Sequence, residues 1–117
     1  MKQIILVEDD GPIRDAFQIV FRNSGYTFIE LTDGEKIIKQ EIDAPDLFIL
    51  DKSISGTDGL DVCRFIKNSA KFKNVPVIMI SANPDINRLA KEAGADGAVS
   101  KPFTLQNIRQ VVSSYLS

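Results

Sequence analysis

The chain has 117 residues, of which 44% are hydrophobic, and carries a formal net charge of -2 at pH 7. This length favours a single domain over residues 1–117, and the scattered basic residues form no patch that would bind nucleic acid directly or an anionic membrane. One cysteine and no histidine exclude internal disulfides, zinc sites built from the usual ligands, and catalysis by a nucleophile paired with histidine.

Short apolar runs, most of them rich in branched residues, recur along the chain, and each predicts a buried strand. The five runs are Gln3–Val7, Tyr26–Leu31, Leu47–Leu50, Val75–Ile80 and Gly97–Ser100. Each intervening segment is long enough for a helix, and such alternation is typical of βα units that build a parallel sheet. The sequence therefore predicts an α/β domain with a five-stranded parallel sheet.

Apolar stripes at helical spacing mark three of the connecting segments. The stripes are Ile13, Phe17, Val20 and Phe21 in the first, Ile86, Leu89, Ala90 and Ala93 in the second, and Leu105, Ile108, Val112 and Tyr115 in the last. Gly11-Pro12 predicts the start of the first helix, and Thr104 is the expected N-cap of the last. Cys63 lies between Leu60 and Ile66 at helical spacing, which predicts a buried thiol.

Acidic residues follow two of the predicted strands directly. Glu8 and Asp9 come after the first apolar run, and Asp51 comes after the third. In open α/β sheets the crevice beyond the carboxyl ends of the strands is where ligands bind. Three carboxylates converging there would repel one another strongly unless a cation lay among them, and Mg²⁺ accepts such oxygen ligands. The pattern therefore predicts a divalent cation site.

Two further polar residues end predicted strands at the same edge. Ser81 follows the fourth strand and would supply a hydroxyl donor, and Lys101 follows the fifth and would supply a compact positive charge. A metal, a carboxylate nucleophile, a lysine and a hydroxyl are the parts needed for phosphoryl transfer to aspartate. Taken singly, these residues would also fit a solvated turn, a helix cap and a surface lysine, so the interpretation depends on the whole set.

The same residues lie in strings that resemble the receiver domain of two-component response regulators. The matching strings are Ile5-Leu6-Val7-Glu8-Asp9-Asp10, Leu50-Asp51, Gly56-Thr57-Asp58-Gly59, Ile80-Ser81-Ala82, Gly94-Ala95-Asp96-Gly97 and Ser100-Lys101-Pro102-Phe103. Their order and spacing cover the chain almost end to end. The resemblance implies a doubly wound, flavodoxin-like (βα)5 fold with strand order 2-1-3-4-5.

The resemblance also implies roles for individual residues. Asp51 would be the phosphoacceptor, and Mg²⁺ would be the cofactor. The implied metal ligands are Glu8, Asp9, Asp51 and the main-chain carbonyl of Ser53. The implied contacts of the phosphoryl group are Ser81 and Lys101, and the Lys101-Pro102 peptide bond is expected to be cis.

The implied function is a signalling switch rather than an enzyme that turns over substrates. Because the chain has no histidine, the phosphoryl group would come from a phosphohistidine on a sensor histidine kinase or a histidine phosphotransfer protein. Phosphorylation would change the affinity for a downstream protein, and we expect a monomer or a weak dimer. The chain would be a stand-alone receiver or one cut from a longer protein.

No apolar run is long enough to span a bilayer, and the run that ends at Glu8 is too short for a signal-peptide core. We therefore expect a soluble, cytoplasmic protein.

Other functions of the same fold stay open. Ala98 stands three residues before the lysine, where receivers usually carry an aromatic residue that moves on activation, and this departure keeps a phosphate-independent interaction module possible. An aspartate-nucleophile phosphatase would typically carry a second acid two residues after the nucleophile, where this chain has Ser53. A flavin-binding module is disfavoured because the acidic segment at Asp9-Asp10 would repel a phosphate.

Overall fold

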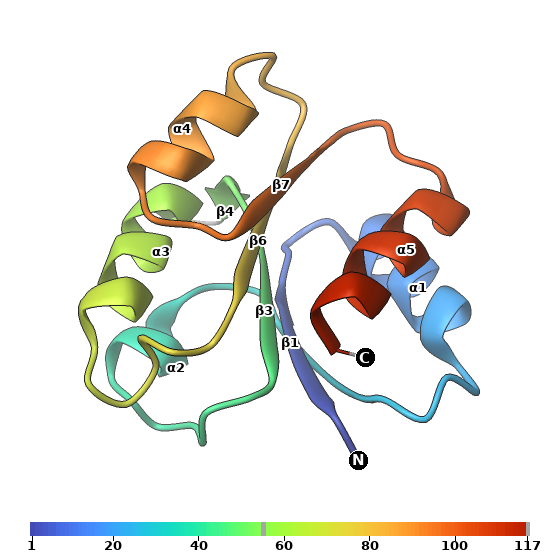
Figure 1. Ribbon diagram of the computed structural model, residues 1–117, viewed down its shortest axis with the longest axis horizontal. Helices are drawn as coiled ribbons and strands as arrows, with labels where there is room; N and C mark the ends of the chain where they lie inside the picture. Colours follow the sequence, from blue (N-terminus) through green and yellow to red (C-terminus); the bar gives the residue numbers. More distant parts are fainter. Residues whose placement is uncertain (55, 117) are drawn as a thin grey trace.

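In the computed structural model, which describes residues 1–54 and 56–116, the chain forms a five-stranded parallel sheet in the order β2-β1-β3-β6-β7 (Figure 1). Ser55, and Ser117 at the end of the predicted domain, lie outside the described residues. The strands are β1 (Gln3–Val7), β2 (Thr27–Leu31), β3 (Leu47–Asp51), β6 (Val77–Ser81) and β7 (Gly97–Ser100). This order confirms the predicted 2-1-3-4-5 arrangement and the flavodoxin-like fold class.

Helices cover both faces of the sheet. They are α1 (Gly11–Phe21), α2 (Glu35–Ile38), α3 (Gly59–Asn68), α4 (Ile86–Glu92) and α5 (Leu105–Leu116). In Figure 1, α1 and α5 lie on one side of the sheet, and α2, α3 and α4 lie on the other. The Thr104 hydroxyl accepts a hydrogen bond from the Asn107 N–H at 3.0 Å, which confirms the predicted N-cap of α5. Among the described residues, no helix is long and apolar enough to cross a membrane.

Alternation along β1 gives the domain two hydrophobic cores, one on each face of the sheet. Ile5 and Val7 pack into the core beneath α3 and α4, whereas Ile4 and Leu6 pack into the core beneath α1 and α5. All four side chains are completely buried, and each contributes about 1.5–3 kcal/mol relative to exposure to water. Burial on both faces explains why the strand is a continuous apolar run in the sequence.

Three strand boundaries differ from the predicted ones by one or two residues. The strand β6 begins at Val77 rather than Val75, because Pro76 has no N–H and uses its carbonyl to accept from the Phe48 N–H at 3.0 Å. The strand β2 begins at Thr27, since the Tyr26 N–H donates to the Ser24 hydroxyl. At the other end of β3, Asp51 is itself the last strand residue.

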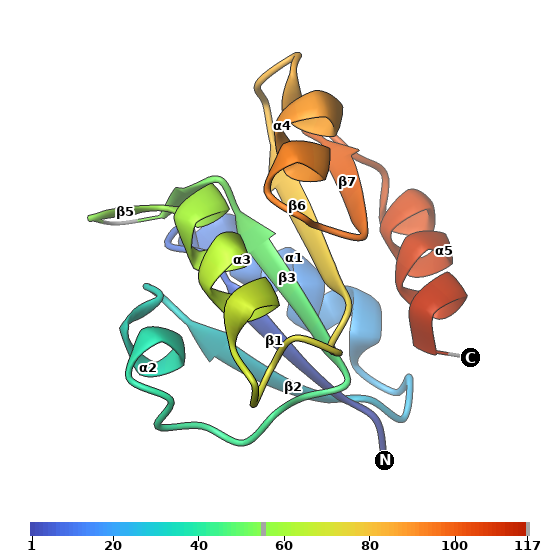
Figure 2. The same ribbon diagram turned by 60° about the vertical axis from the view of Figure 1, so that its left-hand side comes forward.

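A small hairpin follows β3 and was not predicted from the sequence. The strands β4 (Ser53–Ile54) and β5 (Thr57–Asp58) pair antiparallel, and Gly56 between them has a φ of +74°, which glycine adopts without a side-chain clash (Figure 2). The string Gly56-Thr57-Asp58-Gly59 therefore spans the turn at Gly56, the strand β5 and the first residue of α3. This hairpin keeps the residues after Asp51 close to the carboxyl edge of the sheet.

Gly59, the first residue of α3, packs directly against the backbone that carries Asp51. Its N–H donates to the main-chain oxygen of Lys52 at 2.7 Å. A Cβ atom at this position would overlap the main-chain oxygen of Asp51 and lie 2.9 Å from its carbonyl carbon. Close approach of α3 to the end of β3 therefore requires a glycine here.

We predict that Cys63 is inert in the folded protein. Its side chain is completely buried, and burial raises the pKa of the thiol from 9.0 to about 11, so the thiolate fraction near pH 8 falls about a hundredfold. Labelling of Cys63 with a chromogenic disulfide reagent at pH 8 should therefore increase only at the urea concentrations that unfold the protein. Because the unfolded thiol loses its proton first, the free energy of unfolding should fall as the pH rises from 9 towards 11. Rapid labelling of the folded protein would contradict this prediction.

Candidate functional site

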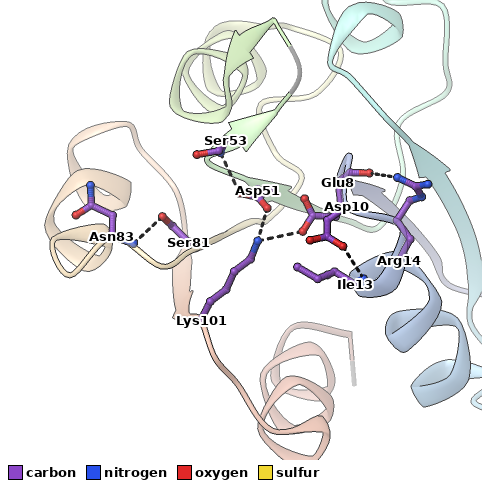
Figure 3. Close-up of polar contacts among 9 residues, drawn as sticks. All are labelled: Glu8, Asp10, Ile13, Arg14, Asp51, Ser53, Ser81, Asn83 and Lys101. Atoms are coloured by element: carbon purple, nitrogen blue, oxygen red, sulfur yellow. Dashed lines mark hydrogen bonds and ion pairs between the residues drawn. The ribbon is translucent and has the colours of Figure 1, made fainter.

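A cleft lies at the carboxyl edge of the sheet, where β1, β3, β6 and β7 end. Its lining residues are Asp9, Asp10, Asp51, Lys52, Ser53, Ser81, Ala82, Asn83 and Lys101. Glu8 lies directly behind this lining and is in contact with Lys101 (Figure 3). The fold therefore places all six residues singled out in the sequence at one edge of the sheet, although it does not assemble them as predicted.

Asp51 is the best-held carboxylate of the cleft. Only 4% of the residue is exposed, its Oδ1 accepts a hydrogen bond from the Ser53 N–H at 2.9 Å, and its Oδ2 accepts one from Lys101 Nζ at 2.5 Å. Burial, the largest single influence, favours the neutral acid, but the interactions with Glu8, Lys101 and the Ser53 amide together lower the pKa of Asp51. The side chain is therefore an ionised, oriented carboxylate at neutral pH.

Glu8 differs from Asp51, because its pKa is raised rather than lowered. It is completely buried, its Oε1 accepts from Lys101 Nζ at 3.1 Å, and its Oε2 has no hydrogen-bond partner among the described residues. Burial and the interaction with Asp51 outweigh Lys101 and raise the pKa of Glu8 from 4.5 to about 7. A buried oxygen without a donor is costly and calls for a partner, and a cation is one such partner.

Lys101 joins the two carboxylates. Its main-chain N–H donates to the main-chain oxygen of Ser81 at 2.8 Å, so the residue is fixed at the end of β7, and its side chain reaches between Glu8 and Asp51 (Figure 3). Desolvation alone would lower the pKa of Lys101, but hydrogen bonds to Asp51 and Glu8 raise it, so the ammonium stays charged. The Lys101-Pro102 peptide bond is cis, as the resemblance implied.

Ser81 ends β6 beside the same cleft. The residue is 5% exposed, and its Oγ accepts a hydrogen bond from the Asn83 N–H at 3.0 Å. A hydroxyl that accepts one hydrogen bond can still donate its own proton. Ser81 is therefore able to donate to an anionic group that enters the cleft.

The carboxylates do not form the predicted three-membered cluster. Among the described residues, no three or more acidic, histidine or cysteine side chains are arranged to hold a metal ion. The ammonium of Lys101 lies between Glu8 and Asp51 and forms an ion pair with each of them (Figure 3). Asp9 is exposed and lines the cleft together with Asp51.

Sequence reasoning missed Arg14, which lies in the first turn of α1 and touches this site. Its Nη1 donates to the main-chain oxygen of Glu8 at 2.9 Å (Figure 3). A basic residue in the first turn of a helix is unfavourable for the helix dipole, and that was the available signal that Arg14 has a specific partner. Lys52 was also unassigned, and its Nζ lies 3.4 Å from Asp58 at the rim of the cleft.

Comparison with known proteins gives one consistent result. The family described as the response regulator receiver domain matches residues 4–113. The transcriptional regulatory protein CseB of Streptomyces coelicolor is 39% identical over 103 residues, which cover 86% of this chain and 43% of that protein. The chain spans less than half the length of the curated relatives it matches.

Solved structures agree with this result. A protein described as a response regulator from Chloroflexus aurantiacus is 29% identical, with a TM-score of 0.90 over 98% of this chain and 97% of that one. The Mn²⁺-bound form of response regulator Rcp1 is 25% identical, with a TM-score of 0.81 over 97% of this chain and 91% of that one.

Proposed function

Because the chain belongs to the response regulator receiver domain family, we propose that it is a phosphoacceptor switch in a two-component phosphorelay. A sensor histidine kinase or a histidine phosphotransfer protein donates a phosphoryl group to Asp51, and the modified domain changes its affinity for a downstream protein. A protein of this kind shifts between two pre-existing states rather than turning over substrate.

The observation that carries the proposal is the state of Asp51, an ionised carboxylate held in an open cleft by Ser53 and Lys101. One of its oxygens attacks the phosphorus atom of a phosphohistidine. The new oxygen–phosphorus bond forms as the phosphorus–nitrogen bond breaks, and the electron pair of that bond returns to the imidazole nitrogen, which takes a proton from solvent. The product is an aspartyl phosphate on Asp51.

The chemistry of the donor atoms fits a divalent metal, although Lys101 pairs with both Glu8 and Asp51 in this structure. All the available donors are oxygens, which Mg²⁺ prefers, and the buried Oε2 of Glu8 has no hydrogen-bond partner among the described residues. The residues that would hold the ion are Glu8, Asp9, Asp51 and the main-chain carbonyl of Ser53. When bound, Mg²⁺ would neutralise charge on the carboxylates and on the phosphoryl oxygens. The Mn²⁺-bound form of Rcp1 supports a divalent ion in this family.

Lys101 and Ser81 would contact the phosphoryl group. In the structure Lys101 forms ion pairs with Glu8 and Asp51, and a phosphoryl group on Asp51 would give its ammonium a stronger anionic partner. Ser81 would donate its hydroxyl proton to another phosphoryl oxygen. Both residues stabilise the developing charge without forming a covalent bond themselves.

One observation favours a second candidate function, a phosphate-independent interaction module. Ala98 pairs with Met79 in the sheet and is partly buried against the core beneath α3 and α4, so a small methyl group occupies this position of β7. A methyl group has too little surface to report phosphorylation by moving between buried and exposed positions. The phosphatase alternative has less support, because Ser53 is exposed and carries no carboxylate.

Metal-dependent phosphorylation tests the proposal. We expect intact-mass spectrometry to show the gain of one phosphoryl group when the protein is incubated with acetyl phosphate and Mg²⁺. The gain should disappear when a chelator replaces the metal and return when excess Mg²⁺ is added. No gain under any of these conditions, in a protein that remains folded by circular dichroism, would favour the phosphate-independent module instead.

A further inference from the structure

Arg14 holds the turn that carries Glu8 and Asp9. Its Nη1 donates to the main-chain oxygen of Glu8 at 2.9 Å, and its own main-chain N–H donates to the main-chain oxygen of Asp10 at 3.1 Å. The two accepting carbonyls belong to Glu8 and Asp10, the residues on either side of Asp9. One residue therefore fixes the backbone on both sides of an acid that lines the cleft.

Two other contacts also restrain this turn. The Glu8 N–H donates to the main-chain oxygen of Leu31 at 3.0 Å, and the Asp10 side chain accepts a long hydrogen bond from the Ile13 N–H at 3.3 Å. The guanidinium of Arg14 reaches Glu8 across Gly11, where a Cβ atom would lie 3.7 Å from Nη2. Of these contacts, only the one made by the Arg14 side chain can be removed by a substitution that leaves the cleft residues and the pairing of β1 with β2 unchanged.

We propose that Arg14 is a positioning residue for the divalent metal, acting through the backbone of Glu8 and Asp9 rather than by contact with the ion. This inference rests on the proposed function, because it assumes that these acids bind Mg²⁺. Metal ligands must be held within about 0.5 Å of the productive geometry, and loss of the residues that orient them typically costs about 10–100-fold in metal affinity. An arginine that only stabilised the start of α1 would change the stability of the fold and leave metal affinity unchanged.

The test is the affinity for Mg²⁺ alone, measured by titration calorimetry on the parent protein, Arg14→Ala, Arg14→Lys and Arg22→Ala. We expect Arg14→Ala to raise the dissociation constant about tenfold, and Arg14→Lys, which keeps the charge and one donor group, to recover part of the loss. Arg22 is the matched control, because it caps the C-terminal end of the same helix, is exposed and does not line the cleft. Arg22→Ala should bind Mg²⁺ as the parent does.

A second measurement separates positioning from chemistry. The rate of phosphorylation of Arg14→Ala by acetyl phosphate should recover to the parent rate when Mg²⁺ is saturating, because the Arg14 side chain donates to the main chain of Glu8, a residue that does not receive the phosphoryl group. A dissociation constant within about twofold of the parent would overturn the positioning role and leave the phosphoacceptor function intact. A parent protein that binds no Mg²⁺ would overturn both. If Arg14→Ala does not fold, the dissociation constant for Mg²⁺ is measured on Arg14→Gln, whose shorter side chain keeps a polar end. The same twofold limit then applies.

Discussion

Asp51→Asn should abolish phosphorylation completely. The amide that replaces the carboxylate has about the same size and can keep the hydrogen bond from the Ser53 N–H, but its oxygen is a poor nucleophile. Among the acids of the site, Asp51 combines a lowered pKa with hydrogen bonds that orient both oxygens, whereas the pKa of Glu8 is raised to about 7. We expect no mass gain with acetyl phosphate and Mg²⁺ in this variant.

Asp61→Asn is the control for that experiment. Asp61 lies on α3, is exposed and forms an ion pair with Arg64 at 2.8 Å, so it offers a carboxylate paired with a cation outside the cleft. This variant should gain one phosphoryl group as the parent does, and hydroxylamine should remove the group, as expected for an acyl phosphate. A mass gain in Asp51→Asn equal to that of the parent would assign the modification to another residue.

Gly59→Ala should destabilise the domain by about 3 kcal/mol or more, which is a large part of the roughly 5–15 kcal/mol that stabilises a domain of this kind. The new methyl group would overlap the main-chain oxygen of Asp51 and lie 3.0 Å from the Cα of Lys52. Both are backbone atoms in or beside β3, so they cannot move aside as the end of a flexible side chain would. The free energy of unfolding, measured with urea, is the appropriate readout.

Gly11→Ala is the matched control, since Gly11 and Gly59 are each the first residue of a helix. The nearest atom to a Cβ at Gly11 is Nη2 of Arg14 at 3.7 Å, which is an ordinary contact, so this variant should be neutral or more stable by about 0.4–1 kcal/mol. Equal effects of the two substitutions would show that close packing against β3 is not the reason for the glycine at position 59.

The strands followed from the sequence because their signal is local and strong, whereas their order was implied by the resemblance to the receiver domain. A strand buried on both faces must be a continuous apolar run, and charge must begin where its carboxyl end reaches solvent, as at Val7-Glu8 and Leu50-Asp51. The β4–β5 hairpin was missed because it contains two-residue strands with no apolar alternation. α2 is only a single helical turn, Glu35–Ile38, and it also left no periodic signal.

The sequence predicted which residues lie at the site, but not how their side chains pair there. Topology alone brings Glu8, Asp51 and Lys101 to one edge of the sheet, and the sequence contains that information. Which charges pair within the cleft depends on distances of an ångström or two. In the structure the ammonium of Lys101 lies between the two carboxylates and Asp9 remains exposed. The contact between Arg14 and Glu8 joins a side chain to a main-chain oxygen, and such pairs leave little trace in residue types.

The alternation along β1 ties the two cores of the domain to its chemistry. Ile4 and Leu6 face one core, Ile5 and Val7 face the other, and Glu8 and Asp9 continue the same strand into the cleft. Inserting or deleting one residue within β1 would exchange the contents of the two cores and displace both acids in a single step. Length changes are therefore tolerable in this part of the chain only beyond the acids. Evolution or engineering can vary the loops of the domain but must keep the number of residues in this strand.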